Sequence, residues 1–189
     1  MVIPRGVYLA LLAALAGERL FELWLSKRNA RRAFARGGIE LGRGQYLVLV
    51  AFHALFLAAC AAGAIVSVIP PSAVMSTLAL LGEIIAQAIR YWSVATLGEK
   101  WNTRVIVIAG DQPVTRGPYR YVRHPNYAAV ALEIACLPLM RGLVIIAMVF
   151  SLANGLVLAL RIRLEERALG EAYARAFAAR SRFIPGMVR

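Results

Sequence analysis

The sequence has few of the residues that build metal centres and disulfide frameworks, with two cysteines and two histidines among 189 residues. Cys60 and Cys136 each stand alone in apolar surroundings, and their spacing fits neither a zinc site nor a disulfide scaffold. We expect both to be buried as small apolar residues. The sequence therefore predicts no metal site.

Acidic residues are also scarce, because 10 Asp and Glu oppose 22 Lys and Arg and leave a formal net charge of +12. Such a charge favours nucleic acid or anionic lipid as a partner. The basic residues cluster in 26–43, 97–123 and 161–189, between or after apolar blocks. No nucleic-acid recognition motif accompanies them, so we expect no nucleic-acid partner and predict contact with membrane lipids.

Apolar residues make up 60% of the chain, whereas a soluble domain has ~45–50%. They lie in blocks long enough to cross a hydrocarbon layer of ~30 Å. We predict one all-α integral membrane domain over 1–189 with five transmembrane helices, three of them in 1–97 and the rest in a second half, 98–189. The expected helices cover 5–28, 45–69, 72–97, 124–140 and 143–163.

Prolines and a short turn separate these helices. Pro70-Pro71 should stop the second helix, because proline cannot continue a helix and disfavours helix in the residue before it. Ser72 is the expected N-cap of the third helix. Pro138 should break the fourth, and Arg141-Gly142 makes the tight turn of a membrane hairpin.

The polar segments have their own predicted structure. Residues 27–43 form a basic loop with a Gly37-Gly38 break. Within the long polar segment 98–123, we predict a short extended piece at 105–109 that a turn closes. Residues 164–182 have the pattern of an amphipathic helix lying in the membrane interface.

The distribution of basic residues predicts the orientation of the chain. Five crossings put the two termini on opposite sides of the membrane. The three basic segments would share the cytoplasmic side under the positive-inside rule. We therefore expect a multi-pass protein of the plasma (inner) membrane, with the N-terminus outside and the C-terminus in the cytoplasm.

Several ionisable residues lie inside the predicted helices, and each has two interpretations. Glu18 and Glu22 share a helix face and either form the wet end of a helix or point into a polar cavity. Glu83 and Arg90 also share a face, as an ion pair with another helix or as substrate contacts. His53 is either a packing residue or a catalytic one.

Two separated polar motifs stand in the second half of the chain. They are Gly117-Pro118-Tyr119 … Arg123-His124-Pro125-x-Tyr127, then Arg161-x-x-x-Glu165-Glu166-x-x-Leu169 … Tyr173 and the closing Arg182-Phe183-Ile184-Pro185. In order and spacing these motifs resemble the isoprenylcysteine carboxyl methyltransferase family of integral-membrane methyltransferases. The resemblance covers about 97–185 and implies that 98–189 is the cofactor-binding half.

Further cues are Glu18-Arg-Leu-x-Glu-Leu23, Ser26-x-Arg-Asn29, Gly38-x-Glu40 and Trp101-Asn102-Thr103. With these residues the first half looks like a narrower bacterial branch of the family. Members of that branch resemble enzymes that O-methylate alkylpyrones and related phenolic lipids made by type III polyketide synthases.

The resemblance implies S-adenosylmethionine as the methyl donor. The pair Gly42-x-Gly44 is no dinucleotide fingerprint, so loop backbone and helix ends would hold the donor. Arg161 and Glu165 are the implied catalytic residues, with Arg161 on the substrate oxygen, where a guanidinium fork suits an oxyanion. Further substrate-binding candidates are Glu18, Glu22, Trp101 and Asn102. The cofactor-binding candidates are Asp111, Gln112, Pro113, Val114, Tyr119, His124, Pro125, Asn126, Tyr127, Glu165 and Glu166.

The same residues have plainer interpretations. Arg161 could be a snorkelling interfacial charge, Glu165 its surface partner one helical turn away, and His124 a helix-start residue. Other functions also stay open: carboxyl methylation of a prenylated cysteine, N-methylation of a phospholipid, a nicotinamide-dependent reductase of the steroid-reductase type, or a non-catalytic membrane protein.

The acceptor would be a lipophilic small molecule that enters from the bilayer. A carboxylate or an acidic hydroxypyrone enol is already ionised near pH 7, whereas a phenol with a pKa of ~10 needs help from a base. We identify no dedicated base in the sequence, which favours acidic acceptors. The oligomeric state is not predicted.

Overall fold

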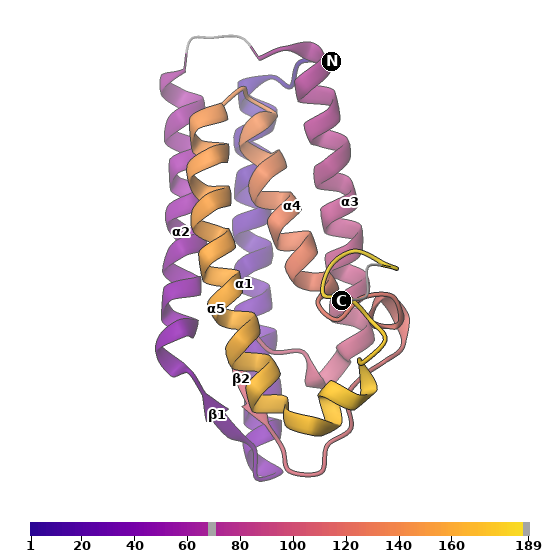
Figure 1. Cartoon of the computed structure of the whole chain (residues 1–189). Helices are drawn as coiled ribbons and strands as arrows, with labels where there is room; N and C mark the ends of the chain where they lie inside the picture. The colour runs from indigo at the N-terminus through magenta and orange to yellow at the C-terminus, as the bar shows by residue number, and fades with distance from the viewer. Residues whose placement is uncertain (68–70, 187–189) are drawn as a thin grey trace.

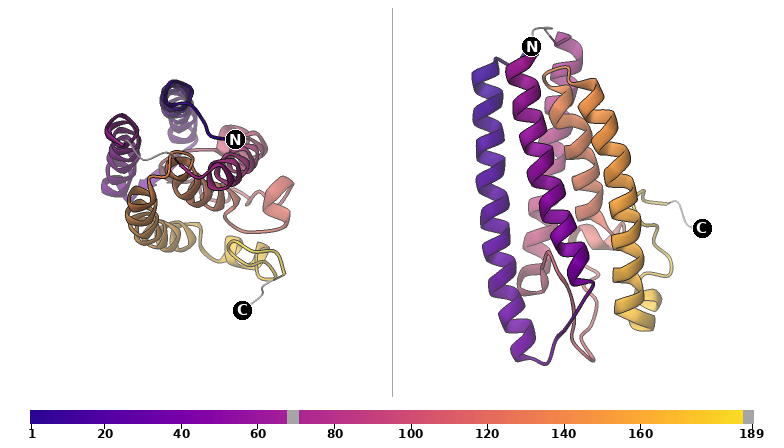
Figure 2. Two further views of the ribbon diagram at one scale, coloured as in Figure 1. Left: turned by 90° about the horizontal axis from the view of Figure 1, so that it is seen from above. Right: turned by 90° about the vertical axis from the view of Figure 1, so that its left-hand side faces the viewer.

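The structure is a computed structural model that describes residues 1–67 and 71–186, and these fold into a bundle of helices (Figure 1). Helices α3 and α5 each pack against α4, which lies between them (Figure 2). Helix α1 packs against α2. The five α-helices of the described residues are α1 Arg5–Ala35, α2 Arg43–Val66, α3 Ala73–Leu97, α4 Pro125–Leu139 and α5 Val144–Ala176.

Two short strands lie at one end of the bundle, at the bottom of Figure 1, beside the lower parts of α1 and α5. The strands β1 (Ile39–Leu41) and β2 (Val105–Val107) pair antiparallel, with Glu40 opposite Ile106. The extended piece expected at 105–109 is thus confirmed over its first three residues. Its partner β1 was not predicted, because a three-residue strand has almost no periodicity to detect.

The apolar core fills the half of the bundle that lies away from the strands. Tyr8, Phe56, Cys60, Ile134 and Leu137 are fully buried there. Cys60 therefore has the buried position expected of it, while Cys136 is half-buried and free. A Cβ added at Gly82 of α3 would lie 2.4 Å from the Cys136 sulfur, so a glycine is needed for α3 and α4 to pack this closely.

Three of the helices, α2, α3 and α5, are long and apolar enough to cross a membrane, judged over the residues that the structure describes. Their outer faces expose large apolar side chains such as Leu55, Leu78 and Leu152, which suits contact with lipid. Helix α4 has 15 residues and spans about 22 Å at 1.5 Å per residue, short of the ~30 Å hydrocarbon layer. Glu18, Arg19 and Glu22 interrupt the apolar run of α1. Five helices are therefore observed, but five crossings are not.

The predicted start of the basic loop is wrong, because α1 continues through residues 27–35. These residues are good helix formers, and Asn29 is buried against the segment after α3, where its Nδ2 donates to the carbonyls of Gly98 and Trp101. The helix ends at Ala35, just before Gly37-Gly38, and not at residue 28 as predicted. At the other break, α2 ends at Val66, and Pro70 of the expected stop lies outside the described residues.

Two further boundaries differ from the prediction. Pro138 does not break α4, because it lies in the last turn and the helix ends at Leu139. Helix α5 does not stop at 163 with a separate helix from 164 to 182. It continues to Ala176 and is interrupted at Gly170, whose φ of 67° is outside the helical range. Glycine reaches this conformation without a Cβ clash, which allows the helix to change direction at this residue. The interruption of α5 thus lies seven residues beyond its predicted end at 163.

Candidate active site

One large cavity, of about 750 Å³, lies between the helices and the polar segment after α3. The whole stretch Trp101–Val114 lines it, together with residues of α1, α2 and the C-terminal half of α5. Pockets for small molecules typically have volumes of ~300–1,000 Å³. The cavity is therefore large enough for a cofactor and part of an acceptor.

The start of α4 brings aromatic and polar side chains to this cavity. Pro125 is the first helical residue, where its missing N–H costs no hydrogen bond. His124 precedes it and is buried, and its ring stacks on Tyr127 with centroids 5.3 Å apart. Its backbone N–H donates to the carbonyl of Arg182, so the C-terminal segment holds this turn in place. His124, Asn126 and Tyr127 line the cavity, whereas Pro125, also predicted to bind the cofactor, is not among its lining residues.

Arg161, Glu165 and Tyr127 form a compact polar group on the cavity wall. The Tyr127 hydroxyl donates to Glu165, and it accepts a 3.1 Å hydrogen bond from Nε of Arg161. Nη2 of Arg161 donates to the carbonyl of Thr103 at 2.8 Å. Arg161 is 3% exposed, and its Nη1 has no hydrogen-bond partner in residues 1–67 and 71–186. The guanidinium is thus fixed on two sides and keeps one donor nitrogen available.

Glu165 and Glu166 face different partners, as expected for neighbours about 100° apart on a helix. Glu165 lines the cavity. Glu166 lies beside it and accepts two hydrogen bonds from Arg182, at 3.0 and 2.6 Å. Nε2 of His124 lies 3.1 Å from the same carboxylate. The hydrogen bond with Glu166 raises the pKa of Arg182 above its ordinary value.

The loop at 110–114 forms another wall, and a basic side chain fixes it. Nζ of Lys100 donates to Oδ1 of Asp111 at 2.8 Å and to the carbonyl of Gln112 at 2.7 Å. Asp111, Gln112, Pro113 and Val114 all line the cavity. Tyr119 lines it too, and burial raises the pKa of its phenol above the ordinary value.

The predicted substrate residues have separate positions. Trp101 and Asn102 line the cavity, and Asn102 is held through hydrogen bonds with Ser26 of α1. Glu22 lines the cavity as well, but Glu18 does not. Glu22 therefore fits the interpretation of an acid pointing into a polar cavity, and Glu18 is its half-buried neighbour.

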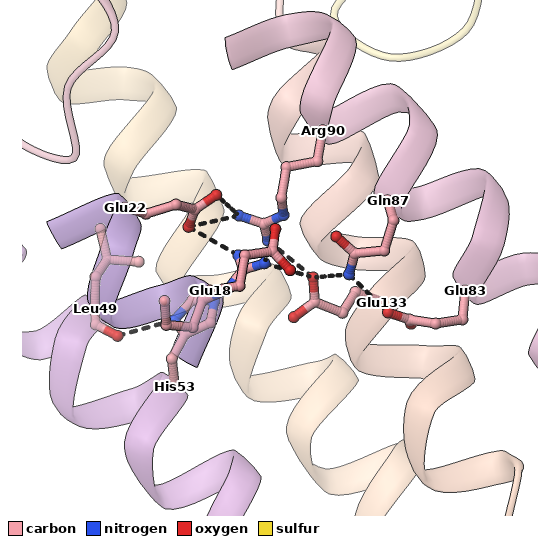
Figure 3. A network of polar contacts seen from close by, with 9 residues as sticks. Glu18, Glu22, Leu49, His53, Glu83, Gln87, Arg90 and Glu133 are labelled. Carbon is pink, nitrogen blue, oxygen red and sulfur yellow. Dashed lines mark hydrogen bonds and ion pairs between the residues drawn. The ribbon is translucent and has the colours of Figure 1, made fainter. Parts of the chain in front are cut away.

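Glu22 belongs to a network of buried ion pairs between α1, α3 and α4 (Figure 3). Arg90 of α3 contacts Glu22 at 3.3 Å and Glu133 of α4 at 2.9 Å. Gln87 bridges Glu133 and Glu83. The interpretation of Arg90 as an ion pair with another helix is confirmed.

Sequence reasoning missed two parts of this arrangement. Glu133 is the one carboxylate of α4, and a charge inside a predicted crossing was the available signal, since such groups face the bundle interior. Thr103 takes part through its carbonyl oxygen, which leaves no signal in the sequence. His53 lines the cavity, and its Nδ1 lies 2.9 Å from the carbonyl oxygen of Leu49.

Comparison with known proteins identifies the family of this chain. A model of the isoprenylcysteine carboxyl methyltransferase (ICMT) family matches residues 77–171. The chain belongs to the ICMT family. The match extends from α3 through α5, so it covers the start of α4, Arg161 and Glu165. ICMT membership makes this chain a membrane methyltransferase, and S-adenosylmethionine is the methyl donor of the family in general.

Two relatives match nearly their whole length. YpbQ of Bacillus subtilis, an uncharacterized protein, is 34% identical over 161 residues, which cover 85% of this chain and 95% of that protein. An uncharacterized protein of Haemophilus influenzae is 27% identical over 168 residues, covering 85% of this chain and 94% of its own. These matches extend the likeness into the first two helices, which the ICMT match leaves out.

Proposed function

We propose that this protein transfers a methyl group from S-adenosylmethionine to an oxygen atom of a lipophilic, membrane-embedded acceptor. The observation that supports this proposal best is the arrangement of Tyr127, Arg161 and Glu165 on the wall of one cavity that the 111–114 loop also lines. These residues come from α4, α5 and the polar segment, and family membership adds the donor chemistry.

The residues on the cavity wall fit the donor. S-adenosylmethionine supplies a methyl group on a cationic sulfonium, together with an adenine, a ribose and an amino-acid tail. Tyr119 and Tyr127 offer aromatic faces, which attract cations and stack on flat rings. The Glu165 carboxylate has the charge to attract the cation. Oδ1 of Asn126 is buried with no hydrogen-bond partner among the described residues, so it can accept a hydrogen bond from the donor.

Arg161 is the residue we assign to the acceptor oxygen. Its buried guanidinium is oriented by the Tyr127 hydroxyl and the Thr103 carbonyl, and Nη1 remains to donate a hydrogen bond. A fixed cation at this place holds an anionic oxygen in one position and stabilises its ionised form. An acceptor that is acidic in water therefore needs no separate base.

Among oxygen acceptors we favour an alkylpyrone or a phenolic polyketide lipid. The polar end of such a molecule fits the wall around Arg161. Its alkyl chain fits the apolar stretch of the cavity between α1 and α2, which includes Leu20, Leu23 and Leu57. Carboxyl methylation of a prenylated cysteine fits family membership equally well. It places a carboxylate at Arg161 and an isoprenoid in the same apolar stretch.

The decisive experiment incubates the purified protein in lipid nanodiscs with methyl-labelled S-adenosylmethionine and three acceptors. These are an alkylpyrone with a free enol, an alkylresorcinol and a farnesylated cysteine. We expect labelled ether products from the first two, identified by mass. Label on farnesylcysteine alone would assign carboxyl methylation instead. Thermal stabilisation by NADPH, with none by S-adenosylmethionine, would reject a methyltransferase, because only a bound ligand stabilises the fold.

A further inference from the structure

A second polar wall of the same cavity is formed by the buried charge network of α1, α3 and α4 (Figure 3). Arg161 and Glu165 have other hydrogen-bond and ion-pair partners, Tyr127 and Thr103 among them. Arg19, Glu22 and Arg90 of this network line the cavity, and His53 of α2 lines it as well. The cavity wall therefore has two polar regions, of which the proposed methyl transfer uses one.

The network contains more carboxylates than guanidinium groups. Glu18, Glu22, Glu83 and Glu133 belong to it, and the two cations are Arg19 and Arg90. With all six ionised, the formal charge is −2. A further carboxylate, or a phosphate, brought by a ligand would meet net repulsion in this buried place. The network is thus unsuited to an anionic group.

Hydrogen-bonding capacity nevertheless remains. Nε of Arg90 is buried without a partner among the residues the structure describes, and Arg90 is 4% exposed. Guanidinium nitrogens of Arg19 lie 3.0 Å from carboxylate oxygens of Glu18 and of Glu22. These ion pairs do not have the geometry of hydrogen bonds, so the Arg19 nitrogens also have no hydrogen-bond partner among the described residues. Buried polar groups normally have hydrogen-bond partners. A ligand atom that accepts hydrogen bonds could therefore pair with the free N–H groups of Arg19 and Arg90.

The same wall also offers acceptors. The ionised carboxylate of Glu22 accepts hydrogen bonds and cannot donate them. The carbonyl of Leu49 can only accept, so Nδ1 of His53 has the hydrogen in their bond, and Nε2 of the neutral ring is an acceptor. A group that both accepts from an arginine and donates to Glu22 or His53 fits this wall. An uncharged hydroxyl does both.

We propose that Arg19, Glu22, His53 and Arg90 form a second subsite that binds an uncharged hydroxyl group of the acceptor, away from the oxygen that is methylated. This inference rests on the proposed function for the identity of the ligand as a methyl acceptor. Among the proposed acceptors it favours phenolic lipids with a second hydroxyl on the polar head, such as an alkylresorcinol, over an alkylpyrone whose single hydroxyl is the enol that is methylated. A prenylated cysteine has no hydroxyl for this position.

Binding measurements test the subsite without any turnover. An alkylresorcinol with two ring hydroxyls and the matched alkylphenol with one are titrated calorimetrically into the full-length protein in nanodiscs, with empty nanodiscs subtracting membrane partition. We expect wild-type protein to bind the resorcinol about tenfold more tightly, the equivalent of one good hydrogen-bonded group. This preference should fall to less than about threefold in Glu22→Gln, which keeps the shape of the side chain.

A second variant and a control complete the test. His53→Phe introduces no buried polar group and should also reduce the preference, so the test survives if Glu22→Gln does not fold. Glu171→Gln changes an exposed carboxylate at the end of α5 and should keep the full preference. Equal wild-type affinities for both ligands would overturn the subsite, and so would a preference unchanged in Glu22→Gln and His53→Phe. Failure of the proposed function is a separate result: no binding or transfer from S-adenosylmethionine, whatever the hydroxyl preference.

Discussion

Nε2 of His124 lies 3.1 Å from Oε1 of Glu166, and this contact joins the start of α4 to the C-terminal half of α5. The same carboxylate accepts two hydrogen bonds from Arg182 in the segment after α5. His124 lines the cavity and Glu166 does not. Glu166 therefore affects the cavity by fixing the position of the histidine ring.

Removing the Glu166 charge should loosen this junction. In Glu166→Gln we expect the free energy of unfolding to fall by about 1–3 kcal/mol, because hydrogen bonds to a charged group are replaced by weaker ones. Affinity for S-adenosylmethionine should fall severalfold as the His124 ring loses its fixed orientation. Thermal unfolding and calorimetric titration measure the two effects. Glu171→Gln, which is exposed, is the control and should change neither. An unaltered Glu166→Gln protein would contradict the connecting role.

The Tyr127 hydroxyl should matter more for turnover than for binding. It lies between Glu165 and Nε of Arg161, which are themselves 4.0 Å apart. In Tyr127→Phe the guanidinium loses one of its two orienting contacts, while the aromatic face remains. We expect kcat to fall about tenfold, since a misplaced catalytic group loses much of its positioning advantage. The KM for S-adenosylmethionine should change less than about threefold. Initial rates measure both, with the exposed Tyr121→Phe as control. A change in KM alone would assign Tyr127 to donor binding only.

Arg161→Lys should separate positive charge from geometry. Lysine keeps the charge but cannot bond the Tyr127 hydroxyl, the Thr103 carbonyl and a substrate oxygen with a planar fork. We expect methyl transfer to fall by about 10²-fold, comparable to the loss of one preorganised donor to a reacting oxygen. Donor affinity should stay close to that of wild type. Arg163→Lys, two residues along the helix and exposed, is the matched control. Equal losses in both variants would show that Arg161 is an interfacial charge.

The sequence predicted the helices better than their ends. Apolar runs longer than a turn or two give a strong signal, and each of the five expected helices is present among the described residues. The ends depend on contacts that a linear pattern does not contain. Asn29 continues α1 past residue 28 because its amide reaches Gly98 and Trp101 across the bundle. Gly170 places the interruption of α5 later than the change in hydrophobicity at 163.

The site was predictable where side chains follow a family motif, and unpredictable where the backbone contributes. His124, Tyr127 and Glu165 lie together as their spacing in the two motifs implied. The Thr103 carbonyl that holds Arg161 leaves no trace in the sequence, because every residue has a carbonyl. The pairing of Glu133 with Arg90 needed the packing of α3 on α4.

The orientation of the chain in the membrane is a separate prediction. The N-terminus lies at the end of the bundle opposite to the strands (Figure 1). There the amino group of Met1 donates a hydrogen bond to Thr77 of α3, and Ser72 is the N-cap of that helix. Basic residues are more frequent at the strand end, which predicts that end to be cytoplasmic. In a background of Cys60→Ala and Cys136→Ala, an impermeant maleimide should label Ser72→Cys in intact cells. It should label Arg43→Cys only after permeabilisation. The reverse pattern would invert the proposed topology.

The buried ion pairs of Arg90 should dominate the stability of the bundle. Its guanidinium contacts Glu22 and Glu133, and Arg90 and Glu133 are each less than 5% exposed. Arg90→Met removes the cation and leaves two buried carboxylates without their main partner. Breaking a buried pair in this way destabilises by about 3–5 kcal/mol. Arg32→Met is the control, because the pair of Arg32 with Glu99 is about half exposed, and exposed pairs contribute ~0–1 kcal/mol. Thermal unfolding in one detergent compares the two variants. If Arg90→Met were as stable as Arg32→Met, Glu22 and Glu133 would not need the Arg90 charge and would have to be protonated or paired with Arg19. The formal charge of −2 for the network, from which the preference for an uncharged ligand group was argued, would then be wrong.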